Sequence, residues 1–434
     1  MIAAADNEVS LDAWITRGAK PIAQGTASAC GAVFDQVIAQ LDPSVELLGF
    51  GEALHGGETI LQLRNLLFAH LVQHHGYRSI ALETGSTRAR LVNGFVTGTV
   101  AGSYADVADA GFGNGFGALA ANRELVEWMR SYNAGAQAKD HIRFYGFDLP
   151  NIAAGIAGPR QTLAIATEYW AAHQGNGDRA AQRQRELDDL IGADADWENP
   201  AAMMDASQAI GRSARASALR IAVEDLIAEL RTRRPELLAG SDAAQFAEAL
   251  HYATTVRELL NFHAAMARPG GAAYAEVLGI RDAAMADNLQ FIVERERRYG
   301  KVLAFAHNSH LQRSAAVLPW ARWWSAGAHL DATMAARYAV IGTGVGASEA
   351  NGIAAAAPAT LEGRLQSPPG FANFIATQRG ETLNKANVEA LAVRSSSSRN
   401  PTYIPLTAQS LQDFDWLAVV PSTTYSRGSR PLPE

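Results

Sequence analysis

The chain has 434 residues, of which 48% are hydrophobic and 19% charged, so it can bury a core in one large domain or in two to three ordinary ones. Its net charge of −7 argues against a protein that binds nucleic acid through the phosphate backbone. The single cysteine, Cys30, excludes an internal disulfide and a thiolate metal cluster, and we expect it to be structural.

The N-terminus has neither the basic region nor the apolar stretch of a signal peptide. No uncharged apolar stretch approaches the roughly 18 residues that a membrane-spanning helix needs. We therefore expect a cytoplasmic protein that acts on a small molecule and binds neither a membrane nor nucleic acid. Nothing in the sequence indicates an oligomeric state.

The first 150 residues alternate between strand-like and helix-like segments. Strands are predicted over 45–52, 77–83 and 142–148, and helices over 58–76, 86–96 and 122–134. Gly76 stands where a C-terminal helix cap belongs, and Ser86 is a plausible N-cap. This alternation is typical of an α/β fold with a mostly parallel sheet.

Residues 151–298 change character. They are rich in Ala, Arg, Glu and Leu and contain three long helical patterns, at 216–234, 244–267 and 275–300. The strand pattern resumes with KVLAFAHNSH (301–310), RYAVIGTGVG (337–346) and WLAVVP (416–421). We predict an α/β fold with a mixed, largely parallel central sheet flanked by helices. Its core is divided into residues 1–150 and 299–434, and residues 151–298 form a large helical insertion lobe.

Ionisable side chains recur where the predicted strands end. These residues are Glu52, followed three positions later by His55; Glu83; Asp148; and His307, followed by His310. One such residue alone is usually a helix cap or a solvated loop residue. Because ligands of α/β sheets bind at the carboxyl ends of the strands, the repetition favours one shared site. The remaining histidines singled out, namely His70, His74, His75, His141 and His251, are expected to be surface or core residues.

The common catalytic motifs are missing. The chain has no G-x-S-x-G elbow, no HExxH helix and no Walker A loop. GTGVGA (342–347) formally fits a dinucleotide fingerprint, but no persuasive crossover helix follows it. Hydrolysis would then require water activated directly by a histidine, whose tautomer a carboxylate would hold. His307, His310 or an arginine could stabilise the negative charge that develops on a carbonyl oxygen.

Several blocks resemble the erythromycin esterase family. They are GEALHGGETI with RNLLFAHLVQHHGYRSIALE, RFYGFDLP, RDAAMADNLQ with KVLAFAHNSHLQR, and FDWLAVVPSTT, in order from about 45 to 425. The resemblance implies a deep cleft between an α/β core and a helical insertion, and hydrolysis of the lactone ester of macrolides. Many members carry an aromatic residue directly after the acidic residue that corresponds to Glu58, where this chain has Thr59. The resemblance therefore supports the fold more strongly than it supports a macrolide substrate.

By matching position, the resemblance implies specific roles. His55 would be the general base, Glu52 and Glu83 would orient the base or the water, and Arg64 would be a cleft arginine. His307 and His310 would serve in oxyanion contact or proton return. We further expect Glu58, Asp148 and Arg281 to bind substrate.

Three functions remain open from the sequence. The first is an esterase without a cofactor. The second is a divalent-metal hydrolase with ligands drawn from Glu52, His55, Glu83, His307 and His310. The third is a non-hydrolytic role in the same cleft, as a cyclase, a transferase or a binding protein for a natural-product intermediate.

Overall fold

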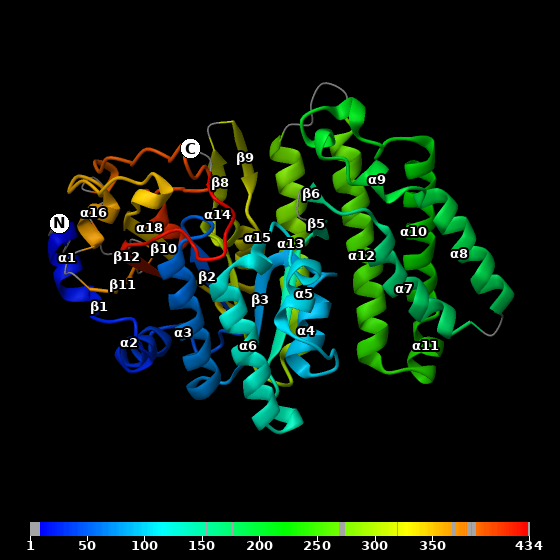
Figure 1. Ribbon diagram of the computed structural model, residues 1–434, viewed down its shortest axis with the longest axis horizontal. Helices are drawn as coiled ribbons and strands as arrows, with labels where there is room; N and C mark the ends of the chain where they lie inside the picture. The colour runs from blue at the N-terminus through cyan, green and yellow to red at the C-terminus, as the bar shows by residue number, and fades with distance from the viewer. Residues whose placement is uncertain are drawn as a thin grey trace, which may run out of the picture.

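A computed structural model describes residues 9–152, 155–174, 177–268, 274–318, 320–366, 370–377, 379, 383 and 388–432. An eight-stranded sheet runs through its centre (Figure 1). In spatial order the strands are β1 (Lys20–Ile22), β11 (Ala372–Ala376), β12 (Trp416–Ser422), β10 (Tyr338–Ala347), β2 (Leu47–Glu52), β7 (Lys301–His307), β3 (Tyr77–Gly85) and β4 (Arg143–Asp148). The six strands from β12 to β4 pair in parallel, whereas β11 pairs antiparallel with both β12 and β1. The mixed, largely parallel sheet is confirmed.

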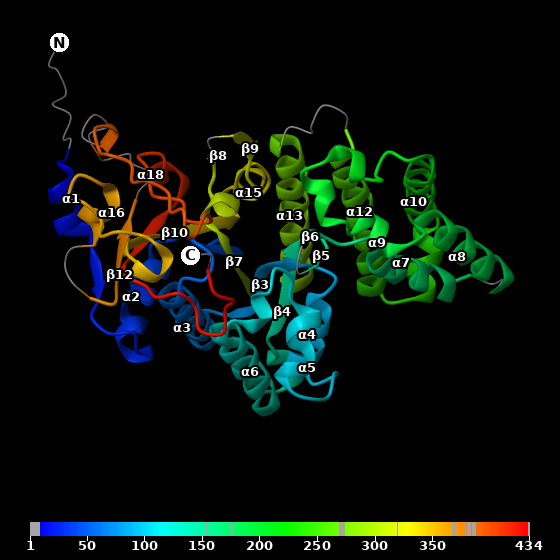
Figure 2. The same ribbon diagram turned by 45° about the horizontal axis from the view of Figure 1, so that its top comes forward.

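Helices cover both faces of this sheet (Figures 1 and 2). The helices whose side chains join the core on one face are α2 (Ala27–Ala39), α3 (Glu58–His74), α4 (Ala89–Thr97), α5 (Tyr104–Gly111) and α6 (Ala120–Gly135). On the other face they are α1 (Leu11–Gly18), α13 (Tyr274–Glu296), α14 (Asn308–Leu311), α15 (Ala326–Met334), α16 (Leu361–Leu365) and α18 (Ser410–Asp413). Successive side chains of a strand point to opposite faces of the sheet, so Phe50 of β2 joins the core on the first face and Leu47 joins the core on the second. A sheet buried on both faces needs such continuous apolar strands.

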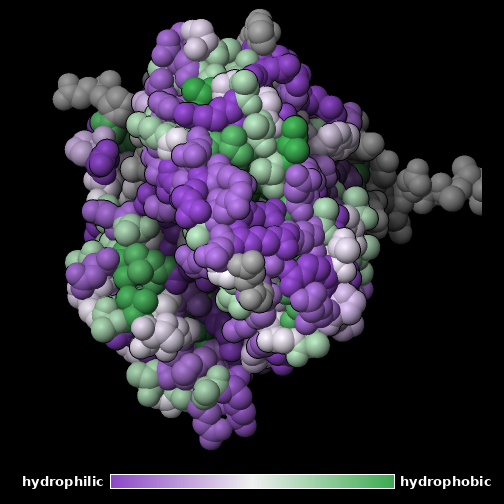
Figure 3. All heavy atoms as spheres, turned by 90° about the vertical axis from the view of Figure 1, so that its right-hand side faces the viewer, coloured by the Kyte–Doolittle hydropathy of each residue, from purple (hydrophilic) through white to green (hydrophobic). Residues whose placement is uncertain are grey.

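The chain between β4 and β7 forms the helical insertion. It contains β5 (Asn151–Ile152), β6 (Gly155–Ile156), α7 (Arg160–Ala172), α8 (Gly177–Ile191), α9 (Asp194–Trp197), α10 (Ala214–Thr232), α11 (Arg234–Gly240), α12 (Ala243–Met266) and α13. Helices α7 to α12 share a separate core that includes Trp170, Leu219 and Val256. The surface on the side of the molecule that the insertion forms is largely hydrophilic (Figure 3). Helix α13 instead packs on the sheet through Met285 and Leu289. The division at residues 150 and 298 stays a prediction.

The helix predicted over 58–76 is α3, and Gly76 adopts the left-handed conformation (φ +70°) that favours glycine at a helix end. The predicted N-cap at Ser86 is wrong, because α4 begins at Ala89. The Ser86 backbone N–H instead donates to the Asp148 carbonyl. The short β1 and β11, and the hairpin of β8 (Ala315–Leu318) and β9 (Ala321–Trp324), were not predicted. None of the helices that the structure describes has the length and apolarity to cross a bilayer.

Candidate active site

A cleft of about 680 Å³ opens at the carboxyl ends of the parallel strands. Its lining includes His55, Glu83, Asp148, Arg281, His307 and His310. These residues come from the ends of four strands and from α13 and α14, and most of these elements are far apart in the sequence. The structure thus brings together most of the residues expected from the strand ends. Apolar side chains such as Phe116, Phe262 and Trp323 form other parts of the wall.

His55 and Glu52 form a hydrogen-bonded pair at the end of β2. The Nδ1 atom of His55 lies 2.6 Å from Oε1 of Glu52. Because the carboxylate accepts the Nδ1 proton, Nε2 is the basic nitrogen of the neutral ring. It lies 4.0 Å from Oε1 of Glu83. Burial alone would lower the pKa of His55, but the carboxylates of Glu83 and Glu52 outweigh it and raise this pKa above 6.5.

A distant loop fixes the backbone of His55. Its N–H donates to Oγ1 of Thr402 (2.9 Å), and its carbonyl accepts from the side-chain amide of Asn400 (3.1 Å). Next to it, Gly56 has φ +78°, and a Cβ there would lie 2.7 Å from the ring of Tyr425. Sequence reasoning missed Asn400 and Thr402, since a polar loop near the C-terminus carries no local signal for contact with β2.

Glu83 lies at the centre of the charged network. Its Oε1 accepts from Arg281 (2.9 Å) and its Oε2 from the backbone N–H of His307 (2.9 Å). The Nε2 atom of His310 is 3.4 Å from Oε1. Burial would raise the pKa of Glu83, but the charges of His310, His55 and Arg281 hold it well below its usual value. Glu83 therefore stays a carboxylate.

Arg281, on α13, is held by two carboxylates. Its Nε and one terminal nitrogen donate to Asp148 at 2.8 and 2.7 Å, a bidentate arrangement, and that terminal nitrogen also reaches Glu83. Burial opposes its charge, but Asp148 and Glu83 outweigh burial and raise the pKa of Arg281. The cleft wall therefore carries a fixed guanidinium.

His310 is oriented by Asp282, a residue that sequence reasoning missed although it follows Arg281 directly. Its Nδ1 atom lies 2.9 and 3.0 Å from the two oxygens of Asp282. The carboxylate also accepts from the indole of Trp323 (3.0 Å) and the backbone N–H of Ala326 (2.8 Å). Burial would lower the pKa of His310, but Asp282 and Glu83 raise it to about 10. Asp282 thus favours the protonated form of His310, whose Nε2 also lies 3.2 Å from Nη1 of Arg281.

Both ring nitrogens of His307 are occupied by hydrogen bonds within the protein. Its Nε2–H donates to the Thr402 carbonyl (2.8 Å), and Nδ1 accepts from the backbone N–H of Ser309 (3.2 Å). Burial and the neighbouring His55 lower the pKa of His307 to about 3, so it is neutral. Its ring centroid is 5.3 Å from that of His55. A part for His307 in oxyanion contact or proton return stays a prediction.

Arg64 lies beneath the cleft floor rather than in the cleft as expected. It is fully buried, donates to Asn122 (2.8 Å) and covers the ring of Phe305 at 4.7 Å. Arg64, Glu52 and Glu83 all line a cavity of about 20 Å³, which is room for one water. Oε2 of Glu52 has no hydrogen-bond partner among the described residues. Burial lowers the pKa of Arg64 to about 10, and the side chain keeps its charge at neutral pH.

Glu58 also lies outside the residues that line the cleft. It begins α3, accepts from Arg427 (2.8 Å) and Gln62 (3.0 Å), and so ties the C-terminal segment to this helix. The expectation that it contacts substrate finds no support in this position.

The cleft carboxylates and histidines do not form a compact ligand set. In the described part of the chain, the group whose ligand atoms all lie within 4.8 Å of one another is Asp35, His70 and His75, on helices outside the cleft.

The sequence matches the erythromycin esterase family over residues 72–423. The comparison with curated proteins found no match. Three solved structures share the fold. A Bacillus cereus protein has 18% identity, a TM-score of 0.74, and coverage of 96% of this chain and 98% of its own. A succinoglycan biosynthesis protein has 15% identity, a TM-score of 0.67 and coverage of 96% and 98%.

A histidine-to-asparagine mutant of the erythromycin esterase EreC, in its open conformation, has 16% identity, a TM-score of 0.69 and coverage of 94% of this chain and 98% of its own. The family match extends over most of the chain, from before β3 to the end of β12. The chain belongs to the erythromycin esterase family.

Proposed function

We propose that this protein hydrolyses an ester or lactone bond, with His55 as the general base that activates water. The observation that carries the proposal is the 2.6 Å bond between Glu52 and His55 at the cleft. It assigns the proton to Nδ1 and leaves Nε2 basic. In the described part of the chain, Nε2 accepts no hydrogen bond that would compete with a water.

The proposed reaction has two steps. Nε2 of His55 takes a proton from water while the water oxygen forms a bond to the carbonyl carbon. The resulting imidazolium lies between Glu52 and Glu83, which stabilise its charge. As the carbon–oxygen ester bond breaks, His55 returns the proton to the alcohol that leaves.

The cleft also offers positive charge for the carbonyl oxygen. Arg281 is fixed by Asp148 and Glu83, and His310 is held by Asp282 in its protonated form. Fixed charges near the position of a developing oxyanion stabilise it without the cost of reorganisation. We assign Arg281 and His310 this electrophilic role, whereas His307 supports the backbone of the site.

Size and lining guide the choice of a test substrate. A cleft of about 680 Å³ falls in the range of sites for drug-sized ligands, and aromatic side chains on its wall favour a large, partly apolar molecule. We propose a macrolide or a related natural-product ester, and erythromycin is the first compound to test.

The test uses metal-stripped protein and erythromycin in water enriched in oxygen-18, followed by mass spectrometry. Ester hydrolysis adds one water and places the heavy oxygen in the new carboxylate. The activity should be lost in His55→Ala and retained in the control His141→Ala, a histidine outside the cleft. A chelator should have no effect. Activity restored only by a divalent ion would support the metal-dependent alternative, and a product without added water would support a cyclase or transferase.

A further inference from the structure

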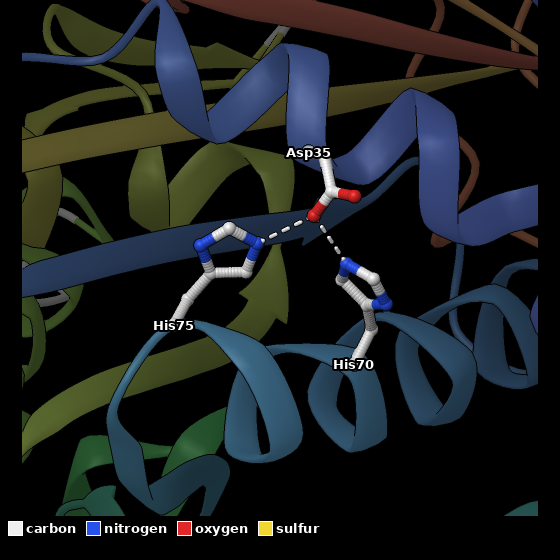
Figure 4. A group of neighbouring side chains, drawn as sticks. All are labelled: Asp35, His70 and His75. Carbon is white, nitrogen blue, oxygen red and sulfur yellow. Dashed lines mark hydrogen bonds and ion pairs between the residues drawn. The ribbon is translucent and has the colours of Figure 1, made fainter.

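Three side chains of metal-ligand types, namely Asp35, His70 and His75, lie close together (Figure 4). Asp35 comes from α2, His70 from α3, and His75 directly follows α3. The position of His75, just before β3 begins, places the group at the amino ends of the strands. The cleft opens at the opposite, carboxyl ends. The hydrolytic machinery therefore does not explain this group.

The two histidines point toward one carboxylate oxygen. Nε2 of His70 lies 2.7 Å and Nε2 of His75 lies 2.8 Å from Oδ1 of Asp35 (Figure 4). In a tetrahedral zinc site with bonds of about 2.0–2.1 Å, neighbouring donor atoms lie about 3.3 Å apart. Each histidine nitrogen would therefore have to move about half an ångström away from the Asp35 oxygen to make room for the ion. Two imidazole nitrogens and one carboxylate oxygen match the preference of zinc.

The surroundings also favour a cation. The group lies at the C-terminal end of α3, a helix of 17 residues, where the helix dipole favours positive charge. The side chain of Asp35 is 56% exposed, whereas those of His70 and His75 are 13% and 21% exposed. The histidines are therefore held in place, and solvent can supply a fourth ligand.

We propose that Asp35, His70 and His75 bind one zinc ion, with water as the fourth ligand. The ion fastens α2 to α3 and stabilises the fold without a part in hydrolysis. Metal that binds the folded chain alone raises its thermal stability in proportion to the logarithm of its concentration.

The test is isothermal titration of zinc chloride into the full, untagged, metal-stripped chain, with thermal denaturation as a second measurement. The ligand variants are Asp35→Asn, at an exposed position, and His70→Gln. Two controls are His74→Gln, whose ring neighbours that of His70 but is outside the group, and His55→Gln in the cleft.

Wild type and both controls should bind one zinc per chain, and zinc should raise their melting temperatures. Each ligand variant should fold without zinc, bind at least about tenfold more weakly and lose the zinc-dependent rise. Equal binding by wild type and the ligand variants would overturn the proposal. Loss of binding in His74→Gln would show a different ligand set, and loss in His55→Gln would place the metal in the cleft; either result overturns it.

Discussion

His55 combines a fixed tautomer with access to the cleft. Its side chain is 27% exposed, while that of its partner Glu52 is 5% exposed. Replacement by alanine should remove general-base catalysis and lower kcat by about 10²- to 10⁴-fold. Steady-state kinetics would measure this loss, and an unchanged melting temperature would show that the fold is intact. Near-normal turnover would contradict the assignment of the base.

The charge of Glu83 favours the protonated form of His55, as do the charge and the hydrogen bond of Glu52. Since a base must be neutral to act, and its pKa is raised above 6.5, kcat/KM should fall as pH decreases through that raised pKa. Glu83→Gln removes one negative charge, so it should move this acidic limb to lower pH. The measurement is the pH dependence of kcat/KM in both proteins. A limb that stays in place would show that Glu83 does not act on His55.

At the scale of the element, Asp282 joins four segments near the cleft. From α13 its carboxylate binds His310 of α14, Trp323 of β9 and the start of α15 at Ala326. It is a positioning residue, because it acts on the cleft through His310. No pattern within one helix could reveal these partners, which only the packing of α13 on the sheet brings together.

Asp282→Asn should destabilise the protein by about 1–3 kcal/mol, because an amide cannot accept from all three donors. The raised pKa of His310 means that its pairing with Asp282 is fully present below pH 6.5 and is lost as pH rises through about 10. The difference from wild type should therefore shrink above that pH.

Urea unfolding of the variant from pH 6 to 10.5 would measure both effects. Asp287→Asn, an exposed site on the same helix, is the matched control and should leave stability nearly unchanged. An equal loss in the two variants would contradict a specific positioning role for Asp282.

At the scale of the whole molecule, two buried histidines, His263 and His307, and the half-buried His251 make the fold sensitive to acid. Burial lowers the pKa of His307 and His251 to about 3 and that of His263 to about 4. His251 stacks on Phe291, between α12 of the insertion and α13. His263 binds the Ala157 carbonyl through Nε2 (3.0 Å). These residues link the insertion and the cleft to the rest of the fold in their neutral forms.

The sign of their effect follows from their pKa values. Between pH 6.5 and about 4, each of these histidines is protonated in the unfolded chain but neutral in the folded chain. The free energy of unfolding should therefore fall by about 1.4 kcal/mol per pH unit for each histidine as the pH decreases. Urea unfolding at pH 7, 5 and 4 would measure the slope. His251→Phe keeps the stacking without the titration, and its slope should be shallower. An identical slope would contradict a contribution from His251.

The strands, the main helices and the convergence of four strand ends were predictable from the sequence. Apolar periodicity is local, and a parallel sheet places the carboxyl ends of its strands together wherever the intervening chain goes. The convergence of four residues could therefore be predicted without knowledge of loop packing, namely Glu52, Glu83, Asp148 and His307. The family resemblance added the roles expected for them.

Only the tertiary structure decided the rest of the site. Thr402 binds His55 across 347 positions, and Glu58 binds Arg427 across 369. Arg64 lies under the floor because α3 turns it toward Asn122 and Phe305 rather than toward the cleft. Such contacts depend on how loops and helices pack on the sheet. No pattern of residue spacing in the sequence predicts these long-range contacts. The sequence therefore determined where the site lies, and tertiary packing determined which side chains enter it.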